Sequence, residues 1–412
     1  MKRIYAIVLV SMGKSLALAT ILILVASSLI LTESAFAQTI PKPSVPEFTA
    51  KYVDRSYTVP ASGAENSWVT KTSMHFSRTG AGAAAVTGIV YVIGGSQRYN
   101  VTGTGFSYLS INATEAYNPA TDTWTLKMPM PTSRDGFGVA IYQNKIYCIG
   151  GRSASATGSQ ATNANEVYDT ETDSWQTKTS MPTARYGIEA NVVDGKFYLI
   201  GGYESFSIPN KSAKVEVYDP VTDTWTTGSP LPTAVGGYAS AVVDGKVYVI
   251  SGSVSESAMT NLTQIYDPKT DKWSLGAPIP MSVSAAAAGA TTGMKAVKAI
   301  YVFGGANAKY PLNGQITNQV YFPETNSWSM AASMPIDRAG SAVAVVNDTL
   351  YVMGGGHNIF TMDSTVVMQY TPFTNPAVEM ESFPVLPVVI VSVVAVAAVA
   401  VGILVYLEKR KG

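Results

Sequence analysis

The sequence of 412 residues contains very little cysteine and histidine. Its single cysteine, Cys148, excludes an intramolecular disulfide. The two histidines, His75 and His357, exclude a metal site made of several imidazoles or of a Cys/His cluster within one chain. No nucleophile elbow, zinc-protease motif or phosphate-loop motif occurs. We therefore expect no metal and no cofactor.

Charge is scarce as well. Charged residues make up 14% of the chain, below the roughly 25% of an ordinary soluble domain, whereas hydrophobic residues make up 47%. With Lys+Arg 28 against Asp+Glu 28, the net charge is zero and gives no basic field for nucleic acid. The high apolar fraction indicates that part of the chain faces lipid rather than water.

The N-terminal end has the pattern of a secretory signal. Lys2, Arg3 and Lys14 precede an apolar run over residues 16–31, and the small residues Ala35 and Ala37 follow it. This order of a basic start, an apolar core and small residues predicts a signal peptide over residues 1–37. An uncleaved membrane anchor is the alternative.

The C-terminal end has the pattern of a membrane-spanning helix. Residues 388–407 form a stretch of 20 residues without charge, which as a helix covers about the 30 Å of a hydrocarbon core. The basic tail, residues 408–412, predicts a cytoplasmic C-terminus and a single-pass protein of the cell membrane with the rest of the chain extracytoplasmic. A buried helix and a removable sorting signal are the alternatives. Residues 38–63 read as an extended linker, and residues 374–387 read as a stalk.

Between these ends, tryptophan recurs with a period near 50 residues. Successive tryptophans are 56, 51, 50, 48 and 55 residues apart, a period that indicates a propeller or an array rather than separate domains. Five of them end a segment that begins with an aromatic Tyr seven positions earlier, as in Tyr117 to Trp124. Such a segment, with Asp or Asn and usually Pro inside it, predicts a tight connection between antiparallel strands. The six are Trp68, Trp124, Trp175, Trp225, Trp273 and Trp328.

Glycine pairs recur upstream of these segments, each after an aromatic and two apolar residues. Such pairs permit positive φ and close backbone approach at the end of a strand. Ser251-Gly252 departs from the pattern by one residue, and Asp194-Gly195 and Asp244-Gly245 predict two-residue hairpin turns. The pairs are Gly94-Gly95, Gly150-Gly151, Gly201-Gly202, Gly304-Gly305 and Gly354-Gly355.

These motifs resemble the kelch repeat over about residues 67–373. The resemblance implies an all-β fold: a six-bladed kelch-type β-propeller over residues 64–373, with four strands in each blade. The first Trp lacks a glycine pair of its own, while the last unit has Gly354-Gly355 and Tyr370 but no Trp. We therefore expect an N-terminal strand at residues 67–74 to complete the last blade, residues 338–373.

Arginine recurs at one phase of the repeat. Val235 and Val283 take the same phase in the third and fourth connections. The hypothesis is a cationic collar around one mouth of the ring that binds carboxylates or sugar acids. The alternative is that each arginine holds its own loop through hydrogen bonds to carbonyl groups. The arginines are Arg78, Arg134, Arg185 and Arg338.

The loops after the glycine pairs are expected to open on the same face and to vary most in length, which suits ligand binding. Aromatic planes and cations there suit sugars and peptides, although simple packing of each loop on its blade is the alternative. The candidate ligand-binding residues are Tyr99, Arg152 and Tyr203, with Phe106, Tyr108, Phe206 and Tyr310 beside them. The candidate glycosylation sites are the sequons at Asn100, Asn112, Asn210, Asn261 and Asn347.

The resulting hypothesis is a monomeric cell-surface propeller that acts as a non-catalytic binding or adhesion module for an extracellular protein or glycan. The signal, the single terminal helix and the lack of disulfides fit a prokaryotic cell surface. The kelch resemblance also implies an enzyme alternative, because kelch-like propellers include sialic-acid mutarotases and copper-dependent sugar oxidases. The oxidases of that family use a Tyr crosslinked to Cys and paired His ligands, whereas here Cys148 lies within an expected strand. An enzyme would need a carboxylate or imidazole deep in the central funnel beside the arginines.

Overall fold

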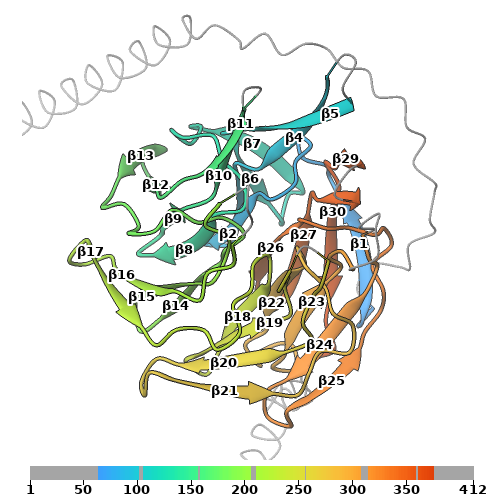
Figure 1. The fold of residues 1–412 in the computed structure, drawn as a ribbon. Helices are drawn as coiled ribbons and strands as arrows, with labels where there is room; N and C mark the ends of the chain where they lie inside the picture. Colours follow the sequence, from blue (N-terminus) through green and yellow to red (C-terminus); the bar gives the residue numbers. More distant parts are fainter. Residues whose placement is uncertain are drawn as a thin grey trace, which may run out of the picture. The chain divides into compact units, whose positions relative to one another are not determined.

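The structure, a computed structural model, describes residues 64–374 except 102–104, 156–157, 206–209, 256, 308–313 and 359–360. Over these residues the chain forms six four-stranded antiparallel sheets, which are arranged as blades around a central axis (Figure 1). The predicted all-β, six-bladed propeller is therefore confirmed. The expected signal peptide, linker, membrane helix and basic tail, and all of the stalk after residue 374, lie outside the described residues. Within the described part, no helix is long and apolar enough to cross a membrane.

Each blade has its first strand beside the axis and its last strand outermost. Blade one consists of β2 (Gly82–Val86), β3 (Ile89–Ile93), β6 (Thr114–Asn118) and β7 (Thr123–Lys127). Blade two consists of β8 (Gly138–Tyr142), β9 (Lys145–Ile149), β12 (Asn165–Asp169) and β13 (Ser174–Thr177). Blade three consists of β14 (Ala190–Val193), β15 (Lys196–Ile200), β16 (Val215–Asp219) and β17 (Thr224–Gly228). Blade four consists of β18 (Ala239–Val243), β19 (Lys246–Ile250), β20 (Thr263–Asp267) and β21 (Lys272–Gly276). Blade five consists of β22 (Ala287–Ala290), β23 (Ile300–Phe303), β24 (Asn318–Phe322) and β25 (Ser327–Met330).

The sixth blade joins the two ends of the propeller. It consists of β26 (Ala342–Val346), β27 (Thr349–Met353), β30 (Val367–Thr371) and β1 (Ser67–Lys71). The N-terminal strand β1 pairs antiparallel with β30, and Trp68 lies opposite Tyr370 (Figure 1, blue beside orange). This is the closure that the phase of the repeat leads us to expect, and it joins residues about 300 positions apart without a disulfide.

The Tyr–Trp segment of each blade holds the preceding blade. In blade three, the Tyr218 hydroxyl donates to Asp223 Oδ1 at 2.5 Å, and the same oxygen accepts the backbone N–H of Thr179, in the preceding blade, at 2.9 Å. The Trp225 indole N–H then donates to the Thr179 carbonyl at 2.9 Å. Both backbone groups of Thr179 are thereby satisfied. We call this arrangement the latch.

The sixth latch is completed by a residue upstream of β1. Asn66 accepts the Tyr370 hydroxyl at 2.8 Å and the backbone N–H of Ala332 at 2.7 Å, while the Trp68 indole donates to the Ala332 carbonyl at 2.8 Å. Asn66 also has the left-handed backbone, φ +50°, that Asp223 adopts at +55°. Asn66 and β1 therefore supply both the acceptor of the sixth latch and the outer strand of the sixth blade.

The glycine pairs are required because the next blade lies against them. A β-carbon at Gly150 would lie 2.8 Å from the Arg185 carbonyl oxygen, and the N–H of Gly151 donates to that oxygen at 2.7 Å. In blade four, Ser251 replaces the first glycine with φ +58°, and its hydroxyl donates to the Val283 carbonyl at 2.8 Å. The N–H of Gly252 still donates to the same carbonyl at 2.9 Å, so the Ser251 side chain adds a second bond between the blades.

A closed ring of six backbone hydrogen bonds surrounds the axis. The residue two positions after each Arg or Val of the repeat donates its N–H to the equivalent carbonyl of the preceding blade, at 2.7 to 3.0 Å. All six residues have φ between +50° and +68°, which favours glycine. We call this the axial ring. Its members are Gly80, Gly136, Gly187, Gly237, Ala285 and Gly340.

The apolar core lies between neighbouring blades rather than within one centre. The cluster between blades one and two includes Tyr91, Ile146, Tyr168 and Cys148. Burial raises the pKa of the Cys148 thiol to about 12, so the thiol stays protonated at neutral pH. Cys148 is therefore a packing residue here.

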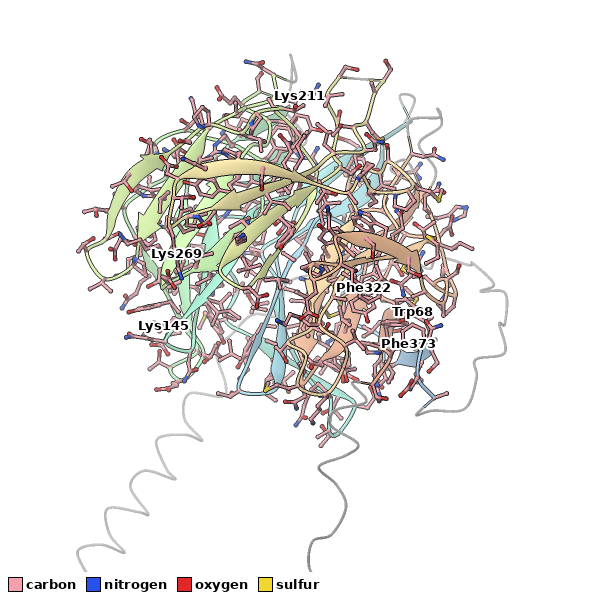
Figure 2. All side chains as sticks on the ribbon, turned by 90° about the horizontal axis from the view of Figure 1, so that it is seen from below. Trp68, Lys145, Lys211, Lys269, Phe322 and Phe373 are labelled. Atoms are coloured by element: carbon pink, nitrogen blue, oxygen red, sulfur yellow. The ribbon has the colours of Figure 1, made fainter. Side chains whose placement is uncertain are left out.

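The two faces of the propeller differ in their connections. The turn face carries two-residue turns such as Asp194-Gly195, whose φ values of +47° and +76° confirm the predicted hairpin. The loop face carries the segments after the glycine pairs and the axial ring. Figure 2 shows Lys211 on the loop face and Lys145 on the opposite side. Because Ser67 pairs with Thr371, the chain enters β1 and leaves β30 on the turn face.

Candidate functional site

The four recurring arginines do not form a collar on the surface. Arg78, Arg134, Arg185 and Arg338 are 1%, 0%, 0% and 8% exposed, and the first three point into their own blades. Arg185 pairs with Glu216 at 2.6 Å and donates to the Gly201 carbonyl at 2.6 Å. The cationic-collar hypothesis is wrong because the guanidinium groups are already used inside the fold. In the other three blades, Arg78 pairs with Glu115, Arg134 pairs with Glu166, and Arg338 donates to the Ser364 hydroxyl.

The chain itself indicates that this arginine serves the blade. In blades four and five, valine replaces the arginine and a glutamine replaces its glutamate partner, as in Val235 with Gln264. Gln264 accepts the N–H of Thr233 at 2.9 Å and donates to the Thr233 carbonyl at 3.0 Å. In blade two, Glu166 and Arg134 share these two roles toward Thr132. A buried ion pair in one blade and a neutral amide in another thus supply the same acceptor and donor to the backbone of the connecting segment.

The loops after the glycine pairs open on the face that carries the arginine segments, as expected. In blade two, for example, Asp135 and Arg152 form a bridge between the two segments. Blades six, one and two extend these loops into two-stranded hairpins: β28 (Gly356–Asn358) with β29 (Thr361–Asp363), β4 (Ser96–Val101) with β5 (Gly105–Ser110), and β10 (Arg152–Ser155) with β11 (Gly158–Ala161).

These three hairpins form a continuous wall along one side of the loop face. Strand β29 contacts β4, and β5 contacts β10, so the hairpins follow one another in ring order (Figure 1). The Ser110 hydroxyl accepts the N–H of Ala154 at 2.9 Å and donates to Asp135 at 3.1 Å. Tyr99, a predicted ligand residue, lies on β4 of this wall and is half-buried. We refer to the three hairpins as the hairpin wall.

Beside the wall, two predicted residues come together with two that the sequence analysis missed. Arg152 pairs with Asp135 at 3.0 Å and lies 6.0 Å from the centre of the Tyr186 ring. Tyr186 stacks on Tyr203 with ring centres 5.1 Å apart, and Lys211 lies 5.7 Å from the Tyr203 ring. This order of cation, ring, ring and cation is favourable because ring faces attract positive charge. We call Arg152, Tyr186, Tyr203 and Lys211 the aromatic stack.

The aromatic stack borders the mouth of the propeller axis. A β-carbon at Gly187, a member of the axial ring, would lie 2.9 Å from the Tyr203 ring. A β-carbon at Gly237, also in the axial ring, would lie 3.7 Å from the Tyr203 hydroxyl. Tyr203 therefore covers the ring between blades three and four, and its aromatic ring leaves no room for a β-carbon at Gly187.

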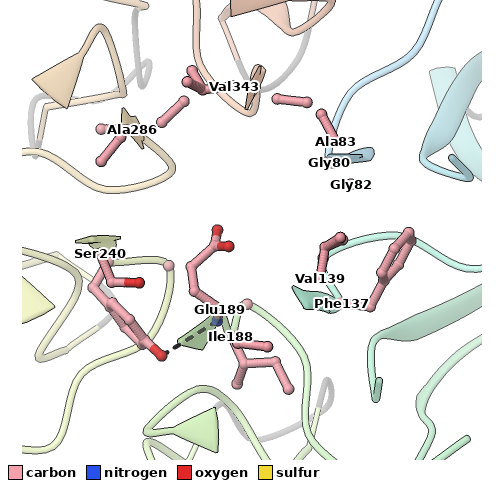
Figure 3. Close-up of a pocket in the computed structure, with 18 of the residues that line it drawn as sticks. Gly80, Gly82, Ala83, Phe137, Val139, Ile188, Glu189, Ser240, Ala286 and Val343 are labelled. Atoms are coloured by element: carbon pink, nitrogen blue, oxygen red, sulfur yellow. Dashed lines mark hydrogen bonds between the residues drawn. The ribbon is translucent and has the colours of Figure 1, made fainter. Parts of the chain in front are cut away.

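A channel of about 410 Å³ runs along the axis and is lined by all six blades (Figure 3). Its walls are backbone and mostly small or apolar side chains, such as Ala83, Val139 and Val343, with the polar side chains of Asn191, Ser240 and Tyr238 among them. The axial ring belongs to this lining, which places the ring end of the channel on the loop face. Its volume lies within the range of roughly 300–1,000 Å³ that small-molecule pockets occupy.

One charged side chain, Glu189, points into this channel (Figure 3). Its backbone N–H donates to the Tyr238 hydroxyl at 3.3 Å, and no described group donates to its carboxylate. The side chain of Glu189 is exposed to the open channel, and the blades that line the channel stand around it. Desolvation by this surrounding protein raises the pKa of Glu189 to about 7.

Glu189 could have been found by comparing the repeats with one another. It stands four residues after the Arg or Val position, where the other five blades have only Gly or Ala. Because the other five blades have only glycine or alanine at this position, packing around the axis does not explain a charged residue there. The six positions are Gly82, Gly138, Glu189, Ala239, Ala287 and Ala342.

We predict that Glu189→Gln stabilises the protein at pH 8 more than at pH 5. The folded-state pKa, about 7, lies above the ordinary glutamate value of 4.5, so the stability linked to Glu189 is full below the lower value and falls as the pH rises through 7. After discounting for channel water, the gain at pH 8 is on the order of 1 kcal/mol. Thermal melting at both pH values measures it, with Glu171→Gln on the turn face as the matched control. Equal effects at the two pH values would contradict the prediction.

The histidines lie in separate local contacts. His75 contacts Glu115 at 2.7 Å, and His357 contacts Asp337 at 2.5 Å. In the part of the chain that the structure describes, no group of three or more His, Cys, Asp or Glu residues could hold a metal ion. Among the predicted glycosylation sites, Asn210, Asn261 and Asn347 are exposed, Asn112 is half-buried, and the Asn100 side chain lies outside the described residues. The same holds for the Phe106 side chain, and for Phe206 and Tyr310 entirely.

Known families match this chain over most of the propeller. The profile of the Attractin/LZTR1 β-propeller family matches residues 146–372, more than half of the chain, and that of the Kelch motif matches residues 77–131. Kelch-like protein 15 of Danio rerio is 26% identical over 291 residues, which are 68% of this chain and 40% of that protein. Kelch-like protein terF of Aspergillus terreus is 36% identical over 137 residues, 32% of this chain and 29% of its own. The matches thus span less than half the length of these relatives.

The fold also resembles a solved structure, that of YjhT. The TM-score is 0.60 with 18% sequence identity, and the similarity covers 72% of this chain and 95% of YjhT. At this identity the resemblance is one of fold.

Proposed function

The chain belongs to the Attractin/LZTR1 β-propeller family and is a kelch-repeat propeller, and from this premise we propose that it is a non-catalytic binding module whose loop face takes a partner protein. The observation that carries the proposal is the asymmetry of the loop face. The hairpin wall rises over blades six, one and two, and the aromatic stack lies beside it at the channel mouth. Loops on a rigid scaffold are where binding residues concentrate.

The composition of this face favours a protein ligand. The hairpin strands β4, β5, β10 and β11 are rich in Ser, Tyr, Gln and Asn, the residue types that combine adaptable hydrogen bonds with aromatic contact area. Tyr203 and Tyr186 supply a rigid aromatic surface at its centre. Such a surface suits a protein epitope, whereas a glycan ligand is the competing outcome of the test below.

We further propose that the propeller is extracytoplasmic and anchored in a cell membrane, prokaryotic by our reading of its ends. The proposal rests on the sequence patterns of a signal peptide at residues 1–37 and a membrane helix at residues 388–407. It agrees with the path of the described chain, which leaves β30 on the turn face. A monomer tethered through that face would leave its loop face free to meet a partner.

Selection of displayed peptides on the purified full chain, alongside a glycan array, tests the proposed binding. We expect enriched peptides whose affinity falls about thirtyfold in Tyr203→Ala, the roughly 2 kcal/mol of a central aromatic contact. Lys269→Ala is the matched control, because Lys269 is exposed on the turn face (Figure 2). Binding to the array with no enriched peptide would reassign the ligand to glycans. Loss in Lys269→Ala and not in Tyr203→Ala would refute the loop face as the site.

The enzyme alternative retains one supporting observation. A carboxylate with a pKa near 7 in an open channel suits general acid–base chemistry. The arginines that a sugar-modifying enzyme was expected to present at the mouth are buried in the blades instead. Conversion of a sugar substrate by the wild-type chain, lost in Glu189→Gln, would favour the enzyme over the binding module.

A further inference from the structure

The central channel carries a negative charge for which the described protein provides no counter-ion. Each of the buried arginines Arg78, Arg134 and Arg185 is paired with a glutamate of its own blade. Glu189 has no such partner, and no described hydrogen-bond donor reaches its carboxylate. In a channel walled by protein, the exposed Glu189 carboxylate is less well solvated than in bulk water, and a positive charge beside it would stabilise its ionised form. The feature therefore points to something that arrives from outside.

We propose that the channel receives a basic group of the bound partner, an ammonium or a guanidinium, with the Glu189 carboxylate as its counter-ion. The inference rests on the proposed function, because the partner that lies on the loop face is what presents this group. It adds the chemical class of the ligand group and the residue that selects it.

The shape of the channel fits a long basic side chain. Small or apolar residues from blades one, two and six line the channel, among them Gly82, Ala83, Val139 and Val343, and the Ser240 side chain lies on the side of Glu189 (Figure 3). Such walls accept the methylene stem of a lysine or arginine while its charged head meets the carboxylate. Glycine or alanine at the equivalent position of the other five blades keeps the axis open for it.

The charges around the channel select for a cation. Glu189 is the one carboxylate in its lining, and the other titratable group there, the Tyr238 hydroxyl, donates to the Ile200 carbonyl at 2.5 Å. At the rim, the charge of Arg152 is balanced by Asp135. Lys211 lies at the outer end of the aromatic stack and leaves a single positive charge there. An anionic ligand would meet Glu189 unscreened, whereas a cation would be held by it.

Carbon-13 NMR of the full chain labelled at the glutamate carboxyl carbon tests this directly. Glu189→Gln assigns the resonance, and its titration is followed with and without n-butylammonium, a mimic of the lysine side chain. We expect butylammonium to lower the apparent pKa of Glu189 by about one unit, because a ligand that prefers the ionised form tenfold shifts the midpoint by that amount. n-Butanol, which has the same stem without the charge, should leave the midpoint unchanged.

The outcomes separate this inference from the proposed function. An unchanged midpoint with butylammonium, or an equal shift with butanol, would overturn the inference even if peptides bind the loop face through Tyr203. A lowered midpoint without any Tyr203-dependent binding would leave a cation site and refute the partner on the loop face. The shift itself is measured on the wild-type chain, and Glu189→Gln serves only to assign the resonance.

Discussion

Removal of residues 64–76 opens the ring and costs most of the stability of the propeller. The deletion takes away β1, the outer strand of blade six, together with Asn66 of the sixth latch. It leaves the edge of β30 without its partner and removes Trp68, which packs against Tyr370 and Phe303. Since domains are held by roughly 5–15 kcal/mol in total, we expect loss of the cooperative unfolding transition.

Circular dichroism during thermal unfolding and size-exclusion chromatography measure this outcome. We expect a broad transition or none, and association through the free β30 edge. Addition of the 64–76 peptide should restore part of the transition. A deleted chain that still melts sharply at the wild-type temperature would show that the ring does not need its N-terminal strand.

A graded version of this experiment isolates the latch. Asn66→Ala keeps β1 but removes the acceptor for the Tyr370 hydroxyl and the Ala332 N–H. We expect a loss of about 2 kcal/mol, because two partly buried donors lose their partner. Asn66→Asp, which copies the residue of blades one to four, is the matched control and should keep the stability.

Arg134→Val destabilises the protein by about 3–5 kcal/mol, the cost of leaving a buried charge without its partner. The variant leaves Glu166 buried beside an apolar side chain, because Arg134 and Glu166 are both shielded from solvent. Adding Glu166→Gln should recover most of the loss. The double variant copies the Val235 and Gln264 pair, in which the amide both accepts and donates toward one backbone residue.

Urea unfolding of the four proteins of this double-mutant cycle gives the coupling energy. Arg152→Ala is the control for a less buried pair, since Arg152 is 17% exposed and its loss should cost about 1 kcal/mol. If Glu166→Gln added to the damage of Arg134→Val instead of relieving it, the equivalence of the two pairs would be refuted.

The sequence predicted the ring well because its signals are local and repeated. The Tyr–Trp segment of a latch, such as Tyr218 to Trp225, lies within eight residues, and a glycine pair recurs in five of the six blades. Even the closure follows from counting, because a first unit without glycines and a last unit without a tryptophan complement each other.

The candidate site was less predictable because it depends on where side chains point. The phase of Arg185 was visible, but nothing local indicates that its guanidinium turns inward to Glu216, 31 residues later. The contact of Tyr186 with Tyr203 joins two connections of one blade, and Glu189 acquires its setting only from six blades together. Comparison of the repeats identifies such positions as exceptions, but only the folded ring shows which residues surround them.

The sixth latch also orders events during protein synthesis. Asn66 emerges from the ribosome early, yet its partner Tyr370 follows 304 residues later. At about 5–20 residues per second, the N-terminal strand waits tens of seconds before it can pair. The first five blades can form in sequence, but a chain interrupted anywhere before residue 367 has no β30 to receive β1. Completion of the ring therefore reports that the whole propeller has been translated.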